Sequence, residues 1–452
     1  MLDIFSNQYI KEGIKNLSEK KQRIIDPLLY EQLNVHIGLR NKEGEGVLAG
    51  LTNISTIISH ERKGTMIVPC DGKLFYSGID VEKLCQGFIE ENRFGFEETI
   101  HLLLFGELPA AKQISNLEAV LEKYRTLPYD FIQQIIMEKP NADIMNMLAR
   151  NVLALYSLDD NPNSNDISCI LHQLLKLIAI FPLLSIYGYY SYIGHKKSAD
   201  LVIHRPKMGI STAENILYML RKDGVYSELE AKILDLMLVL HAEHGGGNNS
   251  TFSMHTVSSS GTDTYSAIAA ALCSLKGPKH GGANIKVVQM ITDIKKNIKN
   301  WEDEEEIKAY LQKILNKEAF DHSGLIYGMG HAVYSISDPR AKILAGFVEK
   351  LSKEKGRVQE YLLYKKIEMI APKVITKNRD NKNISANIDY YSGFIYSMLD
   401  IPYELYTPLF AISRIVGWSA HKIEEQINGA KIVRPSYKGV ANNKMYIPLS
   451  SR

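Results

Sequence analysis

Apolar residues recur along this chain mostly at the three- and four-residue spacing of amphipathic helices. After one glycine-rich turn they define a single face of a predicted helix, formed by Ile285, Val288, Ile291, Ile294 and Ile298. Strand signals are almost absent, apart from one or two short candidates within residues 65–76, where Asp71-Gly72 is a turn dipeptide. The pattern therefore predicts an all-α protein with at most a short N-terminal β-hairpin.

Two further helices have recognisable start signals. Residues 341–351 place their apolar side chains on one face, with Asp338 as the predicted N-cap and Pro339 in the first turn. Thr407-Pro408 repeats this signal before the apolar run 409–423. The sequence thus predicts that both segments begin helices at these positions.

The most apolar stretch, residues 167–190, is long enough to cross a membrane. Lys176 and His172 lie inside it, however, and Pro182 interrupts it. We therefore expect a helix buried in a core or in a subunit interface, and no membrane span.

The composition narrows the class of protein. Hydrophobic residues make up 45% of the 452 residues, charged residues 23%, and the net charge is only +2, which is ordinary for a globular protein and argues against nucleic acid as a partner. Four scattered cysteines without a CxxC pair indicate a reducing compartment, with no disulfide framework. The first residues lack a basic region and a long apolar run, so no secretory signal is expected and we predict a cytoplasmic protein.

Three glycine-rich motifs contain histidines, at residues 240–251, 277–284 and 328–334. In the second motif His280 lies in a turn that opens a helix, where the positive helix end and Lys279 disfavour a second proton on the ring. A neutral histidine there can donate a hydrogen bond to a carbonyl that becomes an enolate. The alternative is a turn that only starts a helix.

Two arginines point to an anionic ligand. Arg340 falls in a first helical turn, where a cation meets the positive helix end; it either pairs with Asp338 at the surface or binds a substrate anion. Arg414 lies in the apolar run 409–418, where an unpaired charge is costly, so a ligand or a buried carboxylate must accompany it.

Together with the segment 387–393, the order and spacing of these motifs resemble the citrate synthase family. The resemblance extends upstream through residues 72–78 and 96–109 and ends near Arg434-Pro435, so it covers the chain from about residue 45. It implies a large helical domain of residues 1–283 and 394–452, with a small helical domain of residues 284–393 inserted between. Residues before about 45 carry no recognisable chemistry.

The resemblance also implies a reaction, the condensation of acetyl-CoA with oxaloacetate followed by hydrolysis of the citryl thioester. It assigns His280 to the enolate, His331 to the ketone of oxaloacetate, and Asp389 to the base that takes the methyl proton. The alternative for Asp389 is the N-cap of a helix over residues 390–398.

Substrate-binding residues follow from the same motifs: His244, Asn248, Arg340, Arg414 and Arg434, the last reaching the site of a neighbouring subunit. Gly328 and Gly330 would let CoA approach the backbone, and Lys382 would contact its phosphates, unless it belongs to a solvated loop. The implied assembly is a homodimer. No cofactor is expected, since the CoA thioester is a substrate.

Other interpretations stay open at this point. A 2-methylcitrate synthase uses the same machinery with propionyl-CoA, and one methyl group is a discrimination of only about 1–3 kcal/mol. A non-catalytic dimeric scaffold or sensor and a metal-dependent hydrolase are further alternatives. His241 and His244 lie at i and i+3, whereas the zincin pattern needs i and i+4, so no metal is predicted. Many relatives have arginine at Ser77, which puts part of the CoA contact in doubt. Many also have proline at Ala386, and its absence here softens the rigidity of the loop.

Overall fold

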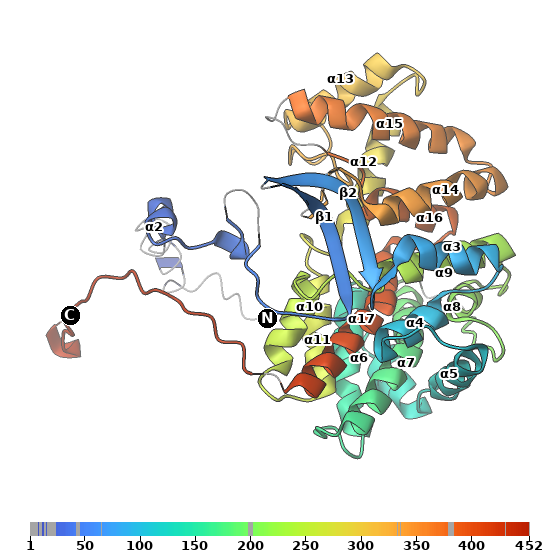
Figure 1. Ribbon diagram of the computed structural model, residues 1–452, viewed down its shortest axis with the longest axis horizontal. Helices are drawn as coiled ribbons and strands as arrows, with labels where there is room; N and C mark the ends of the chain where they lie inside the picture. Colours follow the sequence, from blue (N-terminus) through green and yellow to red (C-terminus); the bar gives the residue numbers. More distant parts are fainter. Residues whose placement is uncertain are drawn as a thin grey trace. The chain divides into compact units, whose positions relative to one another are not determined.

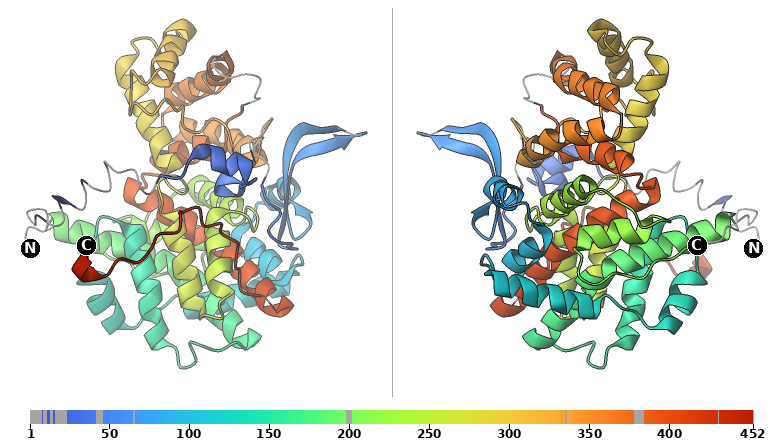
Figure 2. Two further views of the ribbon diagram at one scale, coloured as in Figure 1. Left: turned by 90° about the vertical axis from the view of Figure 1, so that its left-hand side faces the viewer. Right: turned by 90° about the vertical axis from the view of Figure 1, so that its right-hand side faces the viewer.

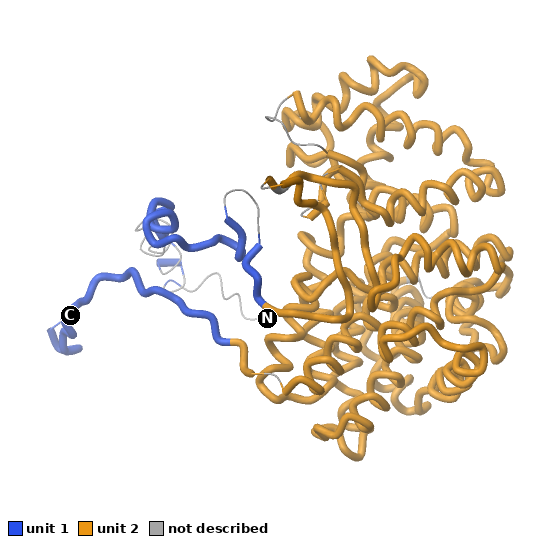
Figure 3. The backbone as a smooth tube through the Cα atoms, in the orientation of Figure 1, with its two compact units in different colours: residues 1–49, 434–452 blue, residues 50–433 orange. Residues whose placement is uncertain are grey.

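The structure is a computed structural model that describes residues 8, 11, 12, 15, 24–41, 46–64, 66–197, 202–331, 333, 334, 336–377, 384–429 and 431–451. It divides into two compact units, residues 1–49 with 434–452, and residues 50–433 (Figure 3). Each unit is described by itself.

In the described part of the smaller unit, the named elements are a short helix α2 (Pro27–Gln32) and two single 3₁₀ turns, η2 (Ile37–Leu39) and η6 (Leu449–Ser451). The described residues 8, 11, 12 and 15 are also helical. Asp26 caps α2 by accepting a hydrogen bond from the Leu28 N–H, and α2 buries none of its side chains.

The larger unit begins with a three-stranded antiparallel sheet in the order β1 (Ser55–Lys63), β2 (Met66–Tyr76) and β3 (Ile79–Asp80). Strands β1 and β2 form a long hairpin that stands out from the helices in Figure 2. Pairing runs from Ser55 opposite Tyr76 to Lys63 opposite Met66, with a register shift between Ile58 and His60.

The predicted turn at Asp71-Gly72 is wrong, because β2 runs straight through both residues and the chain reverses after Lys63. Gly72 serves close packing and not a turn. A Cβ atom there would lie 2.2 Å from the Ser337 carbonyl oxygen and 2.5 Å from Cδ1 of Tyr334. The glycine therefore allows a close approach between the strand and residues 334–337.

The remainder of the larger unit is helical, as the periodicity predicted (Figure 1). The helices are α3 (Val81–Glu90), α4 (Phe96–Phe105), α5 (Ala111–Tyr124), η3 (Phe131–Met137), α6 (Ile144–Leu155), η4 (Tyr156–Leu158), α7 (Ile167–Lys197), α8 (Thr212–Leu220), α9 (Glu228–His241), α10 (Asn249–Ser258), α11 (Thr264–Leu275), α12 (Ala283–Asn297), α13 (Glu304–Leu315), α14 (Pro339–Glu354), α15 (Val358–Lys377), α16 (Ile388–Met398), η5 (Tyr403–Leu405) and α17 (Tyr406–Asn428).

Most of the predicted helix starts agree with the structure. Asp338 caps α14 through the Arg340 N–H, and Pro339 is its first residue. Helix α17 starts at Tyr406, one residue before the predicted signal at Thr407-Pro408.

Helix α7 is the one helix within the described segments that is long and apolar enough to span a membrane by these two criteria. It keeps Pro182 inside, and 61% of its most apolar 18-residue window is buried within the chain. It packs on α5, α6 and α17, as a core helix does.

Helices α12–α16 lie together at one end of the larger unit, and α17 packs among α4, α7, α9 and α10 at the other (Figure 1). Helix α14 links the two groups, because it contacts α9 and β2 as well as α15 and α16. The predicted division at residues 284 and 393 differs from the compact units above and stays a prediction.

Candidate active site

Two loops that carry predicted site residues are joined by backbone pairing. Residues 328–330 form a bridge with residues 385–387, and the Asn387 N–H donates to the Gly328 carbonyl at 2.9 Å. The Asn387 side-chain amide also donates to the Gly330 carbonyl at 2.7 Å. Gly328 and Gly330 have φ of +80° and +84°, a conformation that L side chains rarely adopt. The glycines therefore shape the pairing that holds both loops, while their contact with CoA stays a prediction.

Asp389 follows directly in the first turn of α16. The N-cap is Asn387, whose side chain accepts from the Asp389 N–H at 3.0 Å, so the interpretation of Asp389 as the cap is wrong. Across the described segments, no hydrogen bond reaches the Asp389 carboxylate. Burial raises the pKa of Asp389 to about 6, although Arg340 and Arg414 oppose the shift. The carboxylate is thus a stronger base than an ordinary aspartate, and its oxygens are available to accept a proton from a substrate.

His331 has a defined acceptor nitrogen. Its Nδ1 accepts hydrogen bonds from the backbone N–H groups of Val333 and Tyr334, at 3.0 and 3.2 Å. A neutral ring must then carry its proton on Nε2. His331 can therefore donate a hydrogen bond from Nε2.

The imidazole of His331 contacts two other rings. Its centroid lies 5.1 Å from that of His244 and 5.0 Å from that of Tyr334, and His244 lies 5.5 Å from Tyr334. His244 is buried just beyond the end of α9, and burial, followed by Arg340, holds its pKa well below the usual range. Its Nε2 has no hydrogen-bond partner within the described part of the chain. Two predicted oxaloacetate contacts are thus adjacent.

Arg340 is paired with Asp338, as one alternative proposed, but the pair is buried and not at the surface. Its Nε and Nη2 donate to the two carboxylate oxygens at 3.0 and 2.8 Å, and the side chain is only 3% exposed. Asp338 also accepts from the Ile388 N–H at 3.2 Å, one residue before Asp389. The carboxylate resolves the conflict with the helix end and leaves Nη1 of Arg340 for a ligand.

Arg414 is the most isolated cation of the group. It is 1% exposed within α17, its Nε donates to the His241 carbonyl at 2.7 Å, and its guanidinium lies 4.7 Å from the Phe410 ring centroid. Its Nη1 has no partner within the described residues. Burial lowers the pKa of Arg414 to about 10. An anionic ligand would supply the missing countercharge.

His280 is held by Ser250 from the start of α10. The His280 Nε2 and the Ser250 Oγ are 3.1 Å apart, and the Trp418 indole N–H donates to the same oxygen at 3.2 Å. Burial, with Arg414 second, lowers the pKa of His280 to about 4, so the neutral ring has a different cause from the predicted helix end and Lys279. Ser250 lies in the motif of residues 240–251 and Trp418 in the apolar run 409–423, but nothing in either segment links these residues to His280.

Glu243 stabilises the loop after α9 by accepting hydrogen bonds. Its Oε1 accepts from the Ser55 hydroxyl at 2.9 Å and from the Gly245 N–H at 2.5 Å, and it lies 3.0 Å from Nε2 of His421. Burial raises its pKa, but His421 and these donors overcome that and lower it to about 2. The ionised carboxylate thereby fixes the backbone beside His244.

The neighbouring His241 is a core residue. Its Nδ1 lies 2.8 Å from the Met237 carbonyl, and its ring contacts Phe410 edge-on. Among the described residues no group of three or more histidine, cysteine, aspartate or glutamate side chains could hold a metal ion.

The remaining predicted site residues are Asn248, Arg434 and Lys382. Asn248 caps α10, with its side-chain oxygen accepting from the Ser250 N–H and hydroxyl, so only its amide is left for a substrate. Arg434 belongs to the smaller unit and is exposed there. Lys382 lies outside the described residues. Their roles stay predictions.

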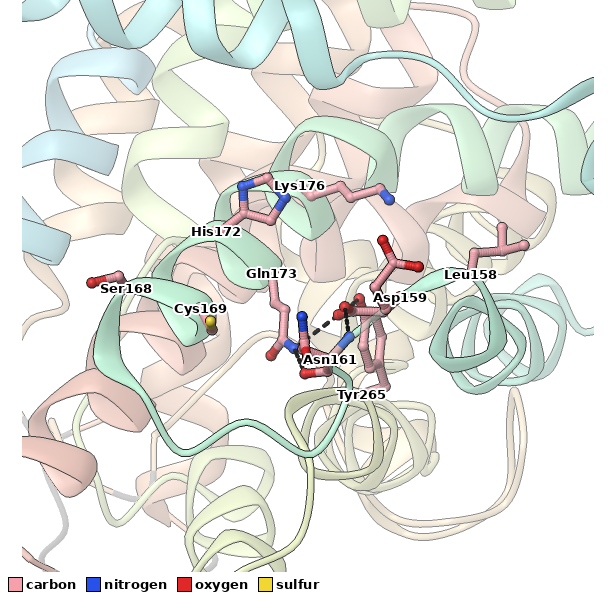
Figure 4. Close-up of a pocket in the computed structure, with 10 residues that line it drawn as sticks. Leu158, Asp159, Asn161, Ser168, Cys169, His172, Gln173, Lys176 and Tyr265 are labelled. Atoms are coloured by element: carbon pink, nitrogen blue, oxygen red, sulfur yellow. Dashed lines mark hydrogen bonds between the residues drawn. The ribbon is translucent and has the colours of Figure 1, made fainter.

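A cavity of about 400 Å³ lies elsewhere, lined by residues 158–161, the first half of α7 and Tyr265 (Figure 4). Asp159 is held there by Tyr265 and Gln173, each at 2.8 Å. None of the predicted site residues lines this cavity. The hydrogen bonds tie the loop before α7 to α11.

Comparison with known proteins decides the family. Residues 39–436 match the family model described as citrate synthase, C-terminal domain. The chain belongs to the citrate synthase family. A citrate synthase of Synechocystis is 33% identical over 91% of this chain and 94% of its own length. A 2-methylcitrate synthase of Shewanella oneidensis is 31% identical over 84% of this chain and 92% of its own.

Solved citrate synthases share the fold. The enzyme of Pyrobaculum aerophilum has a TM-score of 0.73 at 29% identity, covering 90% of this chain and 94% of that one. The enzyme of Thermoplasma acidophilum, solved as a ternary complex with carboxymethyl coenzyme A and oxaloacetate, also has a TM-score of 0.73, at 28% identity over 91% and 99%. This citrate synthase family member is therefore a condensing acyltransferase that converts the acyl group to alkyl on transfer.

Proposed function

We propose that this enzyme condenses acetyl-CoA with oxaloacetate and hydrolyses the resulting citryl thioester to citrate and CoA. The observation that carries the proposal is the buried Asp389 carboxylate, which accepts no hydrogen bond from the described residues and has a pKa of about 6. Arg340 and Arg414 act on this carboxylate, and Arg414 also acts on His280. A base, an uncharged donor and two cations are what enolate formation beside a dicarboxylate requires.

In the first step Asp389 takes a proton from the methyl group of the thioester. The enolate oxygen accepts a hydrogen bond from His280. The Trp418 N–H occupies one lone pair of the Ser250 oxygen. The single Ser250 proton has two acceptors within reach, Asn248 Oδ1 at 2.8 Å and His280 Nε2 at 3.1 Å, and the proposed step requires that it point to His280. His280 then carries its own proton on Nδ1, which faces the thioester in this proposal.

In the second step the enolate carbon attacks the ketone carbon of oxaloacetate and a carbon–carbon bond forms. His331 donates its Nε2 proton to the oxygen that becomes a hydroxyl. Arg340, Arg414 and His244 hold the two carboxylates. Water then cleaves the thioester and releases CoA.

The experiment is a comparison of kcat/KM for acetyl-CoA and propionyl-CoA with oxaloacetate, with citrate or 2-methylcitrate identified as product. A preference for acetyl-CoA supports the proposal, and a preference for propionyl-CoA would make the enzyme a 2-methylcitrate synthase. If neither thioester gave a condensation product, the proposal would be wrong. The Asp389→Asn variant is the control for background hydrolysis.

The proposal includes a homodimer in which Arg434 reaches the partner's site. The C-terminal segment of the smaller unit supports it, since Tyr437 and Met445 are 95% and 91% exposed and large apolar side chains of that kind mark interaction surfaces. Mixed dimers of Arg434→Ala and Asp389→Asn chains should regain one functional site, because the two defects then fall in different sites. An active monomer in sedimentation at assay concentration would contradict the dimer.

We also propose a cytoplasmic location, which is supported by four free cysteines.

A further inference from the structure

Several buried polar atoms have no hydrogen-bond partner within the described part of the chain, among them Nε2 of His244, Nη1 of Arg414 and the hydroxyl of Tyr334. An unpaired buried polar group costs about 1–3 kcal/mol, so folded proteins keep few of them. His244 and Arg414 already have a predicted ligand in oxaloacetate. The Tyr334 hydroxyl has no role in the mechanism above.

The ring of Tyr334 is fixed in place at the site. It is 2% exposed and lies 5.0 Å from the His331 ring and 5.5 Å from the His244 ring. Gly72 lets β2 pack directly against it on another side. A side chain held this firmly presents its hydroxyl in one direction with little entropy left to lose on binding a ligand.

Arg340 lies near the ring of Tyr334. The Arg340 guanidinium lies 5.9 Å from the Tyr334 ring centroid. Its Nη1 donates to no acceptor among the described residues. Asp338 is no acceptor for Tyr334, because its oxygens are taken by Arg340 and the Ile388 N–H. The Tyr334 hydroxyl and the Arg340 Nη1 are therefore two donors without an acceptor among the described residues, and they belong to neighbouring side chains.

Packing alone does not explain the hydroxyl. Phenylalanine would fill the same space between His244, His331 and Gly72, and it would avoid the cost of an unpaired polar atom. A group that costs stability and serves no contact within the fold is typical of a binding site.

We propose that Tyr334 is a further substrate-binding residue, whose hydroxyl donates a hydrogen bond to the carboxylate of oxaloacetate that Arg340 also binds. The inference rests on the proposed function, since it assigns a second donor to the same dicarboxylate. In this role Tyr334 recognises the carboxylate of the substrate and takes no part in proton transfer.

The test is Tyr334→Phe, which keeps the ring and removes only the donor. Hydrogen bonds to charged groups contribute about 1.5–3 kcal/mol, so the Kd for oxaloacetate measured by calorimetry should rise roughly 10- to 100-fold. The KM for oxaloacetate should rise with it. The KM for acetyl-CoA at saturating oxaloacetate should change little. The unfolding temperature without ligand should stay level or rise, because the variant loses an unpaired buried hydroxyl.

The matched control is Tyr190→Phe in α7. The Tyr190 hydroxyl donates to the Met219 and Leu220 carbonyls at 3.1 and 2.8 Å, so its loss should lower the unfolding temperature and leave the Kd for oxaloacetate unchanged. An unchanged Kd in Tyr334→Phe would overturn the inference alone. A raised Kd with an unfolding temperature lowered as in Tyr190→Phe would also overturn it, because the hydroxyl would then be structural. A wild-type enzyme that did not bind oxaloacetate would overturn both the inference and the proposed function.

Discussion

Replacing Asp389 by asparagine should abolish condensation and, at neutral pH, make the protein more stable. The variant removes the base, and general bases contribute roughly 10²–10⁴-fold to rate. It keeps the shape of the side chain and does not touch the residues assigned to oxaloacetate. Calorimetric binding of oxaloacetate should therefore change little while turnover falls by at least 100-fold.

The stability gain follows from the raised pKa of Asp389. Burial moves it from 3.8 in the unfolded chain to about 6 in the fold. Below pH 3.8 both states are protonated and the shift has no effect. As the pH rises from 3.8 through 6, Asp389 ionises first in the unfolded chain. The free energy of unfolding therefore falls by about 3 kcal/mol, or by about 2 kcal/mol after allowing for partial exposure of the side chain. Asparagine cannot ionise, so the variant avoids this loss.

Urea unfolding at one fixed protein concentration, at pH 5 and pH 8, measures the difference between variant and wild type. The gain should be about half as large at pH 5 as at pH 8, because Asp389 is still mostly protonated in the fold at pH 5. A variant less stable than wild type at pH 8, or a gain that did not grow with pH, would refute desolvation as the cause of the raised pKa.

Asp321 is the matched control with the opposite sign. Burial raises its pKa, but hydrogen bonds from Ser323, Tyr327 and Lys286 overcome this and lower it to about 2. The contribution of ionised Asp321 to the free energy of unfolding is present above pH 3.8 and is lost as the pH falls toward 2. Asp321→Asn should therefore destabilise the protein by about 2 kcal/mol, equally at pH 5 and pH 8.

Three further outcomes are expected. Asp338→Asn removes the ionised partner of Arg340 in a buried pair and should lower the free energy of unfolding by about 3–5 kcal/mol, measured by urea titration. Gly393→Ala would place its Cβ 2.6 Å from the Asn284 carbonyl oxygen, so α12 and α16 must separate, at a cost of about 1–3 kcal/mol in the same measurement. Arg414→Met removes a buried cation whose Nη1 has no partner among the described residues, so calorimetric affinity for oxaloacetate should drop at least 100-fold, in line with about 3 kcal/mol for a charged pair.

Local signals predicted the elements of the fold well where one short segment decides the outcome. Asp338 and Pro339 start α14 because the cap and the proline act within one turn. The same local logic failed at Asp71-Gly72. There the decisive contact is with Tyr334 and Ser337, more than 260 residues away, and no pattern within the strand contains it.

The candidate site divides in the same way. The motifs identified His244, His280, His331 and Asp389, because each stands beside glycines or in a recognisable run. Their protonation could not be deduced from those motifs. It depends on Ser250 and on burial, which arise only when distant helices pack together.

The backbone bridge between residues 328–330 and 385–387 has a consequence for how changes in this enzyme combine. His331 follows the first segment and Asp389 follows the second, so a shift of either segment displaces both side chains. Substitutions in one loop should then alter the effect of substitutions in the other. In a double-mutant cycle Gly330→Ala and Asn387→Ala should show a coupling free energy of about 0.5–3 kcal/mol in kcat/KM, where independent sites would simply add. Any engineering of one of these loops must therefore take the other loop into account.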